Sequence, residues 1–416
     1  MNRQPTDWTT PEMRRRIRRR YAAERRFRWL GLGAVALSAM FLAFLLFTMV
    51  AQGARGFTET RVTVPINLAA ARLPVMPAQL RGRGADLALA GAGLQDVVER
   101  SPTRVFGRDG EGLLSPGAWM VVRDAIKADP ALLHGRRRFD LPLASPYDVA
   151  AKGEGTPQAE AVVARLRARG AISTGFNLGF LRDADATDPT RIGIWGALKG
   201  SLLTMLVTLA LAFPIGVLSA LYLEEYAPKN RWTDLIEVSI NNLAAVPSII
   251  FGLLGLAVFL GTFGLPRSAP LVGGLTLALM TMPVIVIAGR NAIKAVPPSI
   301  RDAALGIGAS PVQVVFHHVL PLALPGILTG TIIGMARALG ETAPLLMIGM
   351  RAFIAAPPAG LAAPATVLPV QIFLWSDQVD RGFVEKTSAA IIVLLVVLLA
   401  MNGLAIYLRN RFETRW

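Results

Sequence analysis

Six long apolar stretches constrain this chain more than any other feature of its sequence. A helix that crosses the hydrocarbon core of a bilayer needs about 20 predominantly apolar residues, and each stretch has about that length. The six runs are Leu30–Ala51, Ser201–Leu223, Leu243–Thr262, Leu271–Gly289, Pro325–Met347 and Ser388–Leu408. One such run could be a buried helix of a soluble protein, but six in one chain predict an all-α integral membrane protein.

The residue types that the chain lacks exclude several kinds of chemistry. It has no cysteine and three histidines, which excludes disulfides, thiolate metal sites and a cysteine nucleophile. No cluster of His, Asp and Glu has the spacing of metal ligands, and no G-x-x-x-x-G-K-[ST] motif occurs. The sequence therefore predicts no enzyme centre and no cofactor, and ATP hydrolysis, if it drives this protein, belongs to another subunit.

The distribution of charge predicts a topology. Residues 1–29 hold ten arginines against Asp7, Glu12 and Glu24, and a basic segment beside a spanning helix favours the cytoplasmic side, next to anionic lipid. We therefore expect a cytoplasmic tail over 1–29, a first span over 30–51, and an extracytoplasmic (periplasmic) insertion over 52–194. Five further spans follow within 195–408, and the cytoplasmic tail 409–416 ends the chain. Nucleic-acid binding by the first tail is the weaker interpretation, because its few aromatic residues lie mostly at the membrane edge.

The insertion contains no run long enough to span a bilayer. Within it, the segments Pro116–Ala128 and Thr156–Arg169 have the pattern of short helices. The sequence predicts neither whether the insertion is one compact domain nor what it does.

The fifth apolar run carries two charges, Arg337 and Glu341. An arginine at the centre of a spanning helix costs about 2.5–3.5 kcal/mol on insertion scales. The two residues are four positions apart, so on a helix they share one face and partly neutralise each other. Charged groups in spans mark solute routes, and the planar guanidinium suits an oxyanion such as phosphate. A structural ion pair is the alternative.

Two polar segments next to the spans have more pattern than simple connectors. In the predicted cytoplasmic loop 290–324, Ser299 with Asp302 predicts a helix start, and Gly308 suits its left-handed exit. Ser310, Pro311 and Gln313 predict a second helix start with a capping box. The second segment, Glu224–Glu237, holds four acidic and two basic residues. A solvated charged loop and a partner contact explain it about equally well.

Loop 301–321 resembles a known loop of transport proteins. Asp302-Ala303-Ala304, then Gly308, then Leu320-Pro321 is similar to the Glu-Ala-Ala…Gly…Leu-Pro loop of the permeases of ABC importers. Residues 222–231, 241–249 and 337–342 resemble, more narrowly, the PstA-type permease family of ABC phosphate importers (the MetI-like, type I importer permeases). The likeness is strong over 195–416.

The resemblance implies a fold, partners and roles for named residues. It implies a permease core of a phosphate importer, with phosphate passing near Arg337 and Glu341, and Arg290 as a further pathway candidate. Residues 302–304, 308, 320 and 321 would form the loop that couples to the ATPase. The implied partners are a second permease subunit (PstC-like), two ATPase copies (PstB-like) and a periplasmic phosphate-binding protein (PstS-like). Asp302 departs from the family glutamate, and His318 stands where an aliphatic residue is usual.

Two other classes of protein remain as alternatives to an ATP-driven importer. An ion-coupled secondary transporter of an oxyanion often has internal repeats with broken helices, and loop 301–321 has no second copy in this sequence. A membrane-anchored receptor that binds through residues 52–194 would not need an arginine in its fifth span.

Overall fold

The computed structural model describes residues 10–76, 79–80 and 84–412, which fall into two compact units, 1–52 and 53–416. The described part of the first unit lies mostly in helix α1 (Pro11–Gly56), which contains the predicted first span and the arginines before it. The predicted basic tail also covers residues 1–9, and the predicted last tail covers 413–416; both segments lie outside the described residues.

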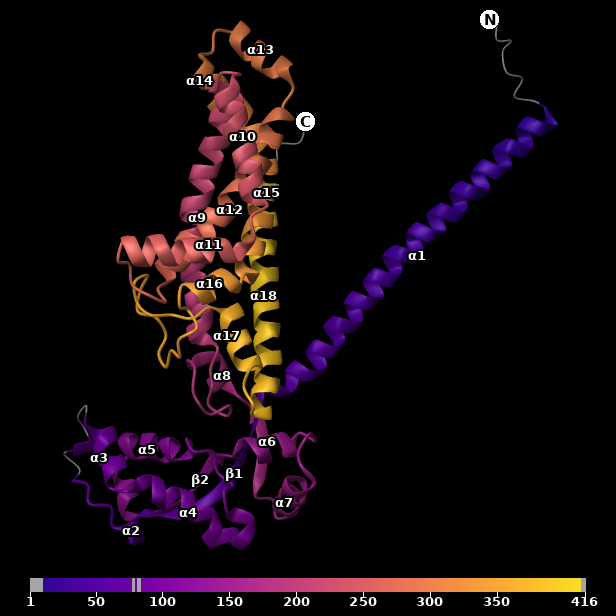
Figure 1. Cartoon of the computed structure of the whole chain (residues 1–416). Helices are drawn as coiled ribbons and strands as arrows, with labels where there is room; N and C mark the ends of the chain where they lie inside the picture. Colours follow the sequence, from indigo (N-terminus) through magenta and orange to yellow (C-terminus); the bar gives the residue numbers. More distant parts are fainter. Residues whose placement is uncertain (1–9, 77–78, 81–83, 413–416) are drawn as a thin grey trace, which may run out of the picture. The chain divides into compact units, whose positions relative to one another are not determined.

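The second unit contains a bundle of long helices (Figure 1). Its long members are α9 (Trp195–Leu221), α12 (Pro270–Lys294), α15 (Leu320–Gly340) and α18 (Arg381–Phe412). Small residues allow these helices to approach closely: a Cβ on Gly216 would lie 2.8 Å from a methyl group of Ile285. Within the described residues, five helices, α1 included, are long and apolar enough to cross a membrane, and a bent pair makes up to six. The prediction of about six spans is confirmed.

The bent pair corrects the third predicted span, Leu243–Thr262. Helix α10 (Arg231–Ala244) ends there, and α11 (Ser248–Leu254) continues as the π-helix η5 (Gly255–Thr262) at an angle of 103° to α10. Pro247 explains the break, because a proline disfavours helical geometry in the residue before it, and Pro247 itself is extended with ψ 135°.

The insertion folds around a small antiparallel sheet that was not predicted. The central strand β1 (Thr58–Asn67) pairs with β2 (Arg136–Pro142) on one side and with β3 (Ile172–Phe176) on the other. Val62, Val64 and Ile66 alternate along β1 and are fully buried in one apolar core. The fold is otherwise helical, as expected.

Helices cover this sheet and connect it to the bundle. The two predicted helices are confirmed as α5 (Ala118–Ala128) and α7 (Pro157–Ala168), the latter capped by Thr156. The other elements of the insertion are α2 (Leu68–Ala71), α3 (Ala85–Gly91), α4 (Leu94–Phe106), η2 (Gly107–Gly110), η3 (Pro130–His134), α6 (Ser145–Ala151) and α8 (Leu178–Arg182).

Short elements close the two ends of the bundle. At the predicted cytoplasmic end lie η4 (Tyr222–Tyr226), α13 (Pro298–Gly306), α14 (Pro311–Gln313) and η6 (Val314–Val319). They share a core that includes Val296, Ala304 and Val319. Towards the insertion lie α16 (Ala343–Met347) and α17 (Leu368–Ser376).

Candidate functional site

The structure brings together the two charges of the fifth apolar run. Arg337 lies in the last turn of α15, and its Nε donates to Glu341 Oε1 at 3.4 Å. Glu341 is not on the helix as predicted, because α15 ends at Gly340 and Glu341 has an extended backbone with ψ 130°. The predicted continuous helix through Met347 is therefore wrong, and the interruption comes three residues before Pro344, which lies in the first turn of the separate helix α16.

Glycines fix the orientation of α15 against α12. Gly326, Gly330 and Gly334 recur every four residues and face Ala292, Ala288 and Thr281 of α12. A Cβ at Gly330 would collide with the Cβ of Ala288. Small residues at this spacing let two helix backbones approach closely, which is typical of packing inside membranes.

Arg337 lies on a different face of α15 from these glycines, and Glu341 follows the end of the helix. Ile333 and Arg337, one turn apart, are exposed, whereas Gly334 and Ala338 are buried. The Arg337 side chain is 49% exposed and that of Glu341 is 18% exposed. The guanidinium therefore keeps donors free for a further anionic group, in addition to the one that Glu341 accepts.

Arg290, the third pathway candidate, belongs to a different charge cluster. It lies near the end of α12, where its Nη2 donates to Glu237 at 2.8 Å and its Nε donates to Glu224. Lys294 adds a second cation 3.4 Å from Glu224. The Arg290 side chain is 11% exposed, so its bonding capacity is largely taken up by two carboxylates. The geometry supports an ion pair that ties α12 to η4 and α10.

The charged segment 224–237 thus has partners within the chain. One of them is Arg301, a residue that the sequence did not single out. Arg301, in the first turns of α13, donates to Glu225 Oε1 at 2.7 Å and to the Val296 carbonyl at 2.7 Å. It also reaches the Ile293 carbonyl at the end of α12, at 3.1 Å. Arg301 therefore fastens α13 both to η4 and to α12. Its position directly before Asp302 was the available signal.

The two helices predicted in loop 290–324 are present, with one correction. Gly308 has φ +89°, the left-handed exit expected of it, and Ser310 and Gln313 form both halves of the capping box. Ser299, however, does not cap α13, because the helix already begins at Pro298. Proline starts the helix because its fixed φ suits the first turn and its missing N–H is not needed there.

This loop presents a mixed surface to its surroundings. Asp302 and Ala303 are exposed and Ala304 is buried in the core beneath them. Ile307 is 83% exposed and Leu305 is 50% exposed. The other two predicted coupling residues, Leu320 and Pro321, begin α15. An exposed apolar pair beside the Asp302 carboxylate, which has no side-chain partner among the residues that the structure describes, is suited to a protein partner.

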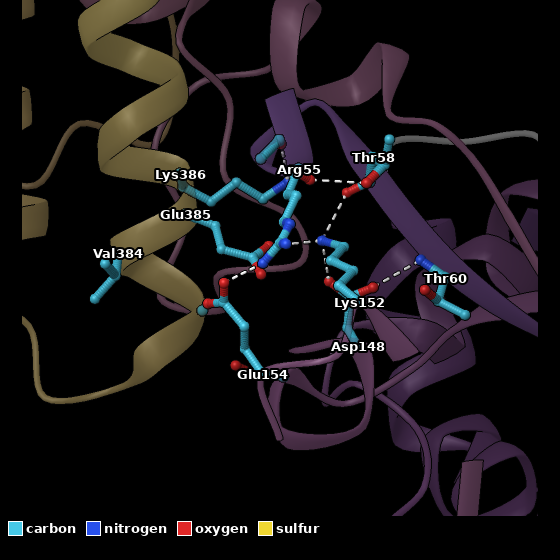
Figure 2. A network of polar contacts seen from close by, with 12 residues as sticks. Arg55, Thr58, Thr60, Asp148, Lys152, Glu154, Val384, Glu385 and Lys386 are labelled. Atoms are coloured by element: carbon cyan, nitrogen blue, oxygen red, sulfur yellow. Dashed lines mark hydrogen bonds and ion pairs between the residues drawn. The ribbon is translucent and has the colours of Figure 1, made fainter. Parts of the chain in front are cut away.

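A network of buried charges joins the insertion to α18 (Figure 2). Lys152 of the insertion donates to Asp148 at 2.8 Å, to Glu385 of α18 at 2.8 Å and to the Thr58 carbonyl at 3.0 Å. Next to it, Lys386 donates to the Gly56 carbonyl at 2.7 Å. The side chains of Lys152, Asp148 and Glu385 are all less than 10% exposed.

Comparison with known proteins gives two family matches. Residues 212–414 match the family described as "Binding-protein-dependent transport system inner membrane component". Residues 14–161 match a domain of unknown function, DUF3333. The first match covers most of α1 and the larger part of the insertion, and the second begins within α9 of the helical bundle.

The individual proteins that this chain is similar to are named as permeases. Phosphate transport system permease protein PstA 1 of Mycobacterium tuberculosis is 36% identical over 38% of this chain; the chain spans about half of that relative, 51% of its length. PstA of Haemophilus influenzae is 32% identical over 50% of this chain and 73% of its own length. The probable ABC transporter permease protein YqgI of Bacillus subtilis is 30% identical over 49% of this chain and 74% of its own.

Proposed function

Because the chain belongs to the family of binding-protein-dependent transport system inner membrane components, we propose that it is the permease subunit of an ATP-driven importer of inorganic phosphate. The observation that carries the choice of an anion is the Arg337–Glu341 pair at the end of α15, in which the Arg337 side chain is 49% exposed. Relatives named as phosphate permeases support the choice of phosphate among the oxyanions.

The pair would act through reversible binding of the anion. The guanidinium of Arg337 offers parallel donors that match two oxygens of a phosphate. Glu341 already accepts one donor at 3.4 Å, so it competes with the anion and repels it. A site built in this way holds an anion weakly enough to release it, which passage through a membrane requires.

The energy for transport would enter through α13. We assign Asp302, Ala303, Ala304 and Gly308 to a docking surface for an ATPase partner, with Leu320 and Pro321 at its connection to α15. Arg301 ties α13 to the end of α12, and α12 packs on α15 through the glycines. A displacement of α13 by the ATPase would therefore be transmitted through α12 to α15, which carries Arg337. We propose a PstB-like ATPase dimer and a PstC-like second permease as the partners.

The orientation completes the proposal. Both termini and loop 290–324 would be cytoplasmic, and residues 52–194 would face the periplasm together with 349–387. There a PstS-like phosphate-binding protein would deliver the anion. Arg290 would hold the cytoplasmic end of α12 in place.

Reconstitution tests this function. The chain, its second permease and its ATPase are reconstituted in proteoliposomes, and the binding protein is added on the face opposite the ATPase. Uptake of radiolabelled phosphate is then measured with and without ATP. We expect uptake that requires both ATP and the binding protein, and that excess sulfate does not inhibit. Uptake driven by an ion gradient without ATP would instead favour the secondary transporter.

A further inference from the structure

A recess lies between the insertion and the bundle. It has a volume of about 580 Å³ and is lined by residues of 116–120 and 182–191 on one side and of 353–357 on the other. The first two segments belong to the insertion and the third to the connection between α16 and α17. All three are predicted to be extracytoplasmic, so the recess opens on the side from which an imported solute arrives.

Internal hydrogen bonds fix the walls of this recess. Asp185 Oδ1 accepts from Trp375 Nε1 at 2.9 Å, which joins the insertion side of the recess to α17. Asp188 Oδ1 accepts from Thr190 Oγ1 at 2.9 Å, and Arg191 donates to the Gly117 carbonyl at 3.4 Å. Three of the five charged residues that line the recess are therefore engaged in holding its shape.

The other two charged side chains of the recess have no partner among the described residues. Arg182 and Asp183 are both exposed, and within the described part of the chain neither side chain makes a hydrogen bond or an ion pair. Together they offer adjacent charges of opposite sign at the edge of a preformed hollow. Such a surface is typical of partners that meet and separate, because electrostatic complementarity guides their encounter.

The two sides of the recess are held together independently of any ligand. Lys152 bridges Asp148 and Glu385 in the buried network of Figure 2, and Lys386 lies over the Phe180 ring at 5.3 Å from its centroid. Gly56 lies so close to α18 that a Cβ there would collide with the Glu385 carbonyl. The insertion is therefore a fixed extension of the bundle.

We propose that this recess is a docking site, shared by the insertion and the bundle, for the extracytoplasmic solute-binding protein of the importer. The inference rests on the proposed function, and it gives the insertion, part of which belongs to the matched domain of unknown function, a role in receiving that protein. A permanent permease partner is the less suitable occupant, because permanent interfaces are more apolar. The exposed apolar side chains of α10, such as Leu235 and Ile236, suit such a partner better.

Exchanging the two free charges tests the proposal. The affinity of the purified phosphate-binding protein is measured for the complete transporter in nanodiscs, with Arg182→Asp combined with Asp183→Arg. We expect a loss of about fivefold, the upper range for exposed charge pairs, and a weaker dependence of the association rate on salt. The matched control exchanges the adjacent exposed charges of α4, Glu99→Arg with Arg100→Glu, and should leave affinity unchanged.

A second variant fills the recess without changing its charge. Ala356→Trp places a large ring at an exposed lining position and should weaken binding by about tenfold, the cost of overpacking a fitted contact. Because the chain has no cysteine, Ala356→Cys labelled with benzophenone-maleimide should photo-crosslink the binding protein at a single site.

Unchanged affinity in both variants would overturn the docking site. Loss of the second permease from the purified variants would also overturn it, because the recess would then belong to that interface. Phosphate uptake by the unmodified transporter is measured in parallel. If uptake by the unmodified transporter is normal and the variants keep their affinity for the binding protein, the docking site alone is rejected. If the unmodified transporter takes up no phosphate, the proposed function is rejected.

Discussion

Arg337 Nε lies 3.4 Å from Glu341 Oε1 although the helix that carries Arg337 ends one residue before Glu341. The pair therefore spans a break in the backbone, so a movement of α16 relative to α15 would change the distance between its charges. A pair within one rigid helix could not be adjusted in this way.

Replacing Arg337 tests the pathway role. Arg337→Gln should lower phosphate uptake by about tenfold or more, because it removes the charge-assisted hydrogen bonds to the anion, each worth about 1.5–3 kcal/mol. Membrane insertion should survive, since the new side chain is less costly in lipid. Initial uptake rates at equal protein level measure the effect.

The conservative variant Arg337→Lys serves as the comparison, because it keeps the charge but not the planar fork. Uptake should fall with lysine too, but less than with glutamine. Equal, normal uptake by both variants would leave the pair a structural contact.

Gly308 should be sensitive to a single added methyl group. At φ +89° an alanine in place of Gly308 adds about 1–2 kcal/mol of backbone strain. We expect the turn between α13 and α14 to shift in order to relieve this strain. Gly308→Ala should raise the number of ATP molecules hydrolysed per phosphate imported. The matched control is Gly306→Ala: both positions have open space around a Cβ, but only Gly308 has a positive φ. If the two variants couple equally well, the turn is not part of the coupling device.

The glycine contact between α15 and α12 should not tolerate a branched side chain. Gly330→Val forces methyl groups into Ala288 and should lower the stability by about 1–3 kcal/mol. Gly403→Val in α18, where a Cβ meets nothing within 4 Å, is the control. Thermal unfolding in detergent compares the two, and an equal shift would remove the packing argument.

The buried network should make Lys152 important for the stability of the junction. Lys152→Met leaves the carboxylates of Asp148 and Glu385 buried without their cation, which costs about 3–5 kcal/mol. Limited proteolysis should then cut the insertion at lower protease concentrations. Lys127→Met, which removes an exposed ion pair with Asp86, should change this little. Equal resistance to protease in both variants would contradict the role of the network.

Removing the charge of Asp185 should increase the stability of the folded protein in a pH-dependent way. Burial raises the pKa of this carboxyl, although the hydrogen bond from Trp375 opposes the shift. An acid with a raised pKa destabilises the fold as pH rises from its unperturbed value of about 4 through the raised one. Asp185→Asn keeps an acceptor for Trp375 and should raise the unfolding temperature at neutral pH. The gain should vanish below the unperturbed pKa; a gain at every pH would point to a cause other than ionisation.

Much of the bundle could be predicted because local signals and long-range packing agree there. Apolar runs of spanning length, the Ser310–Gln313 capping box and the left-handed Gly308 each depend on a few neighbouring residues. The pairing of Arg337 with Glu341 followed from their spacing, even though the helix between them ends early.

The remaining features depend on contacts between residues far apart in the chain. Nothing near Arg290 in the sequence identifies Glu224 and Glu237 as its partners, and nothing near Lys152 identifies Glu385. The sheet was missed because β1 is paired by strands about 70 and 110 residues later. The recess combines three such distant segments, so no local pattern indicates it.

The crossing at Gly56 and Glu385 limits how such a protein can be shortened or recombined. A version trimmed of the insertion would leave Glu385 and Lys386 without the Lys152 ammonium and the Gly56 carbonyl that now satisfy them. The same insertion transplanted into a shorter permease would leave Lys152 with Asp148 but without Glu385, its partner on the last helix. Adding or removing the insertion therefore requires changes at Glu385 and Lys386, near the start of the last helix. The insertion and the start of that helix can be exchanged between permeases only together.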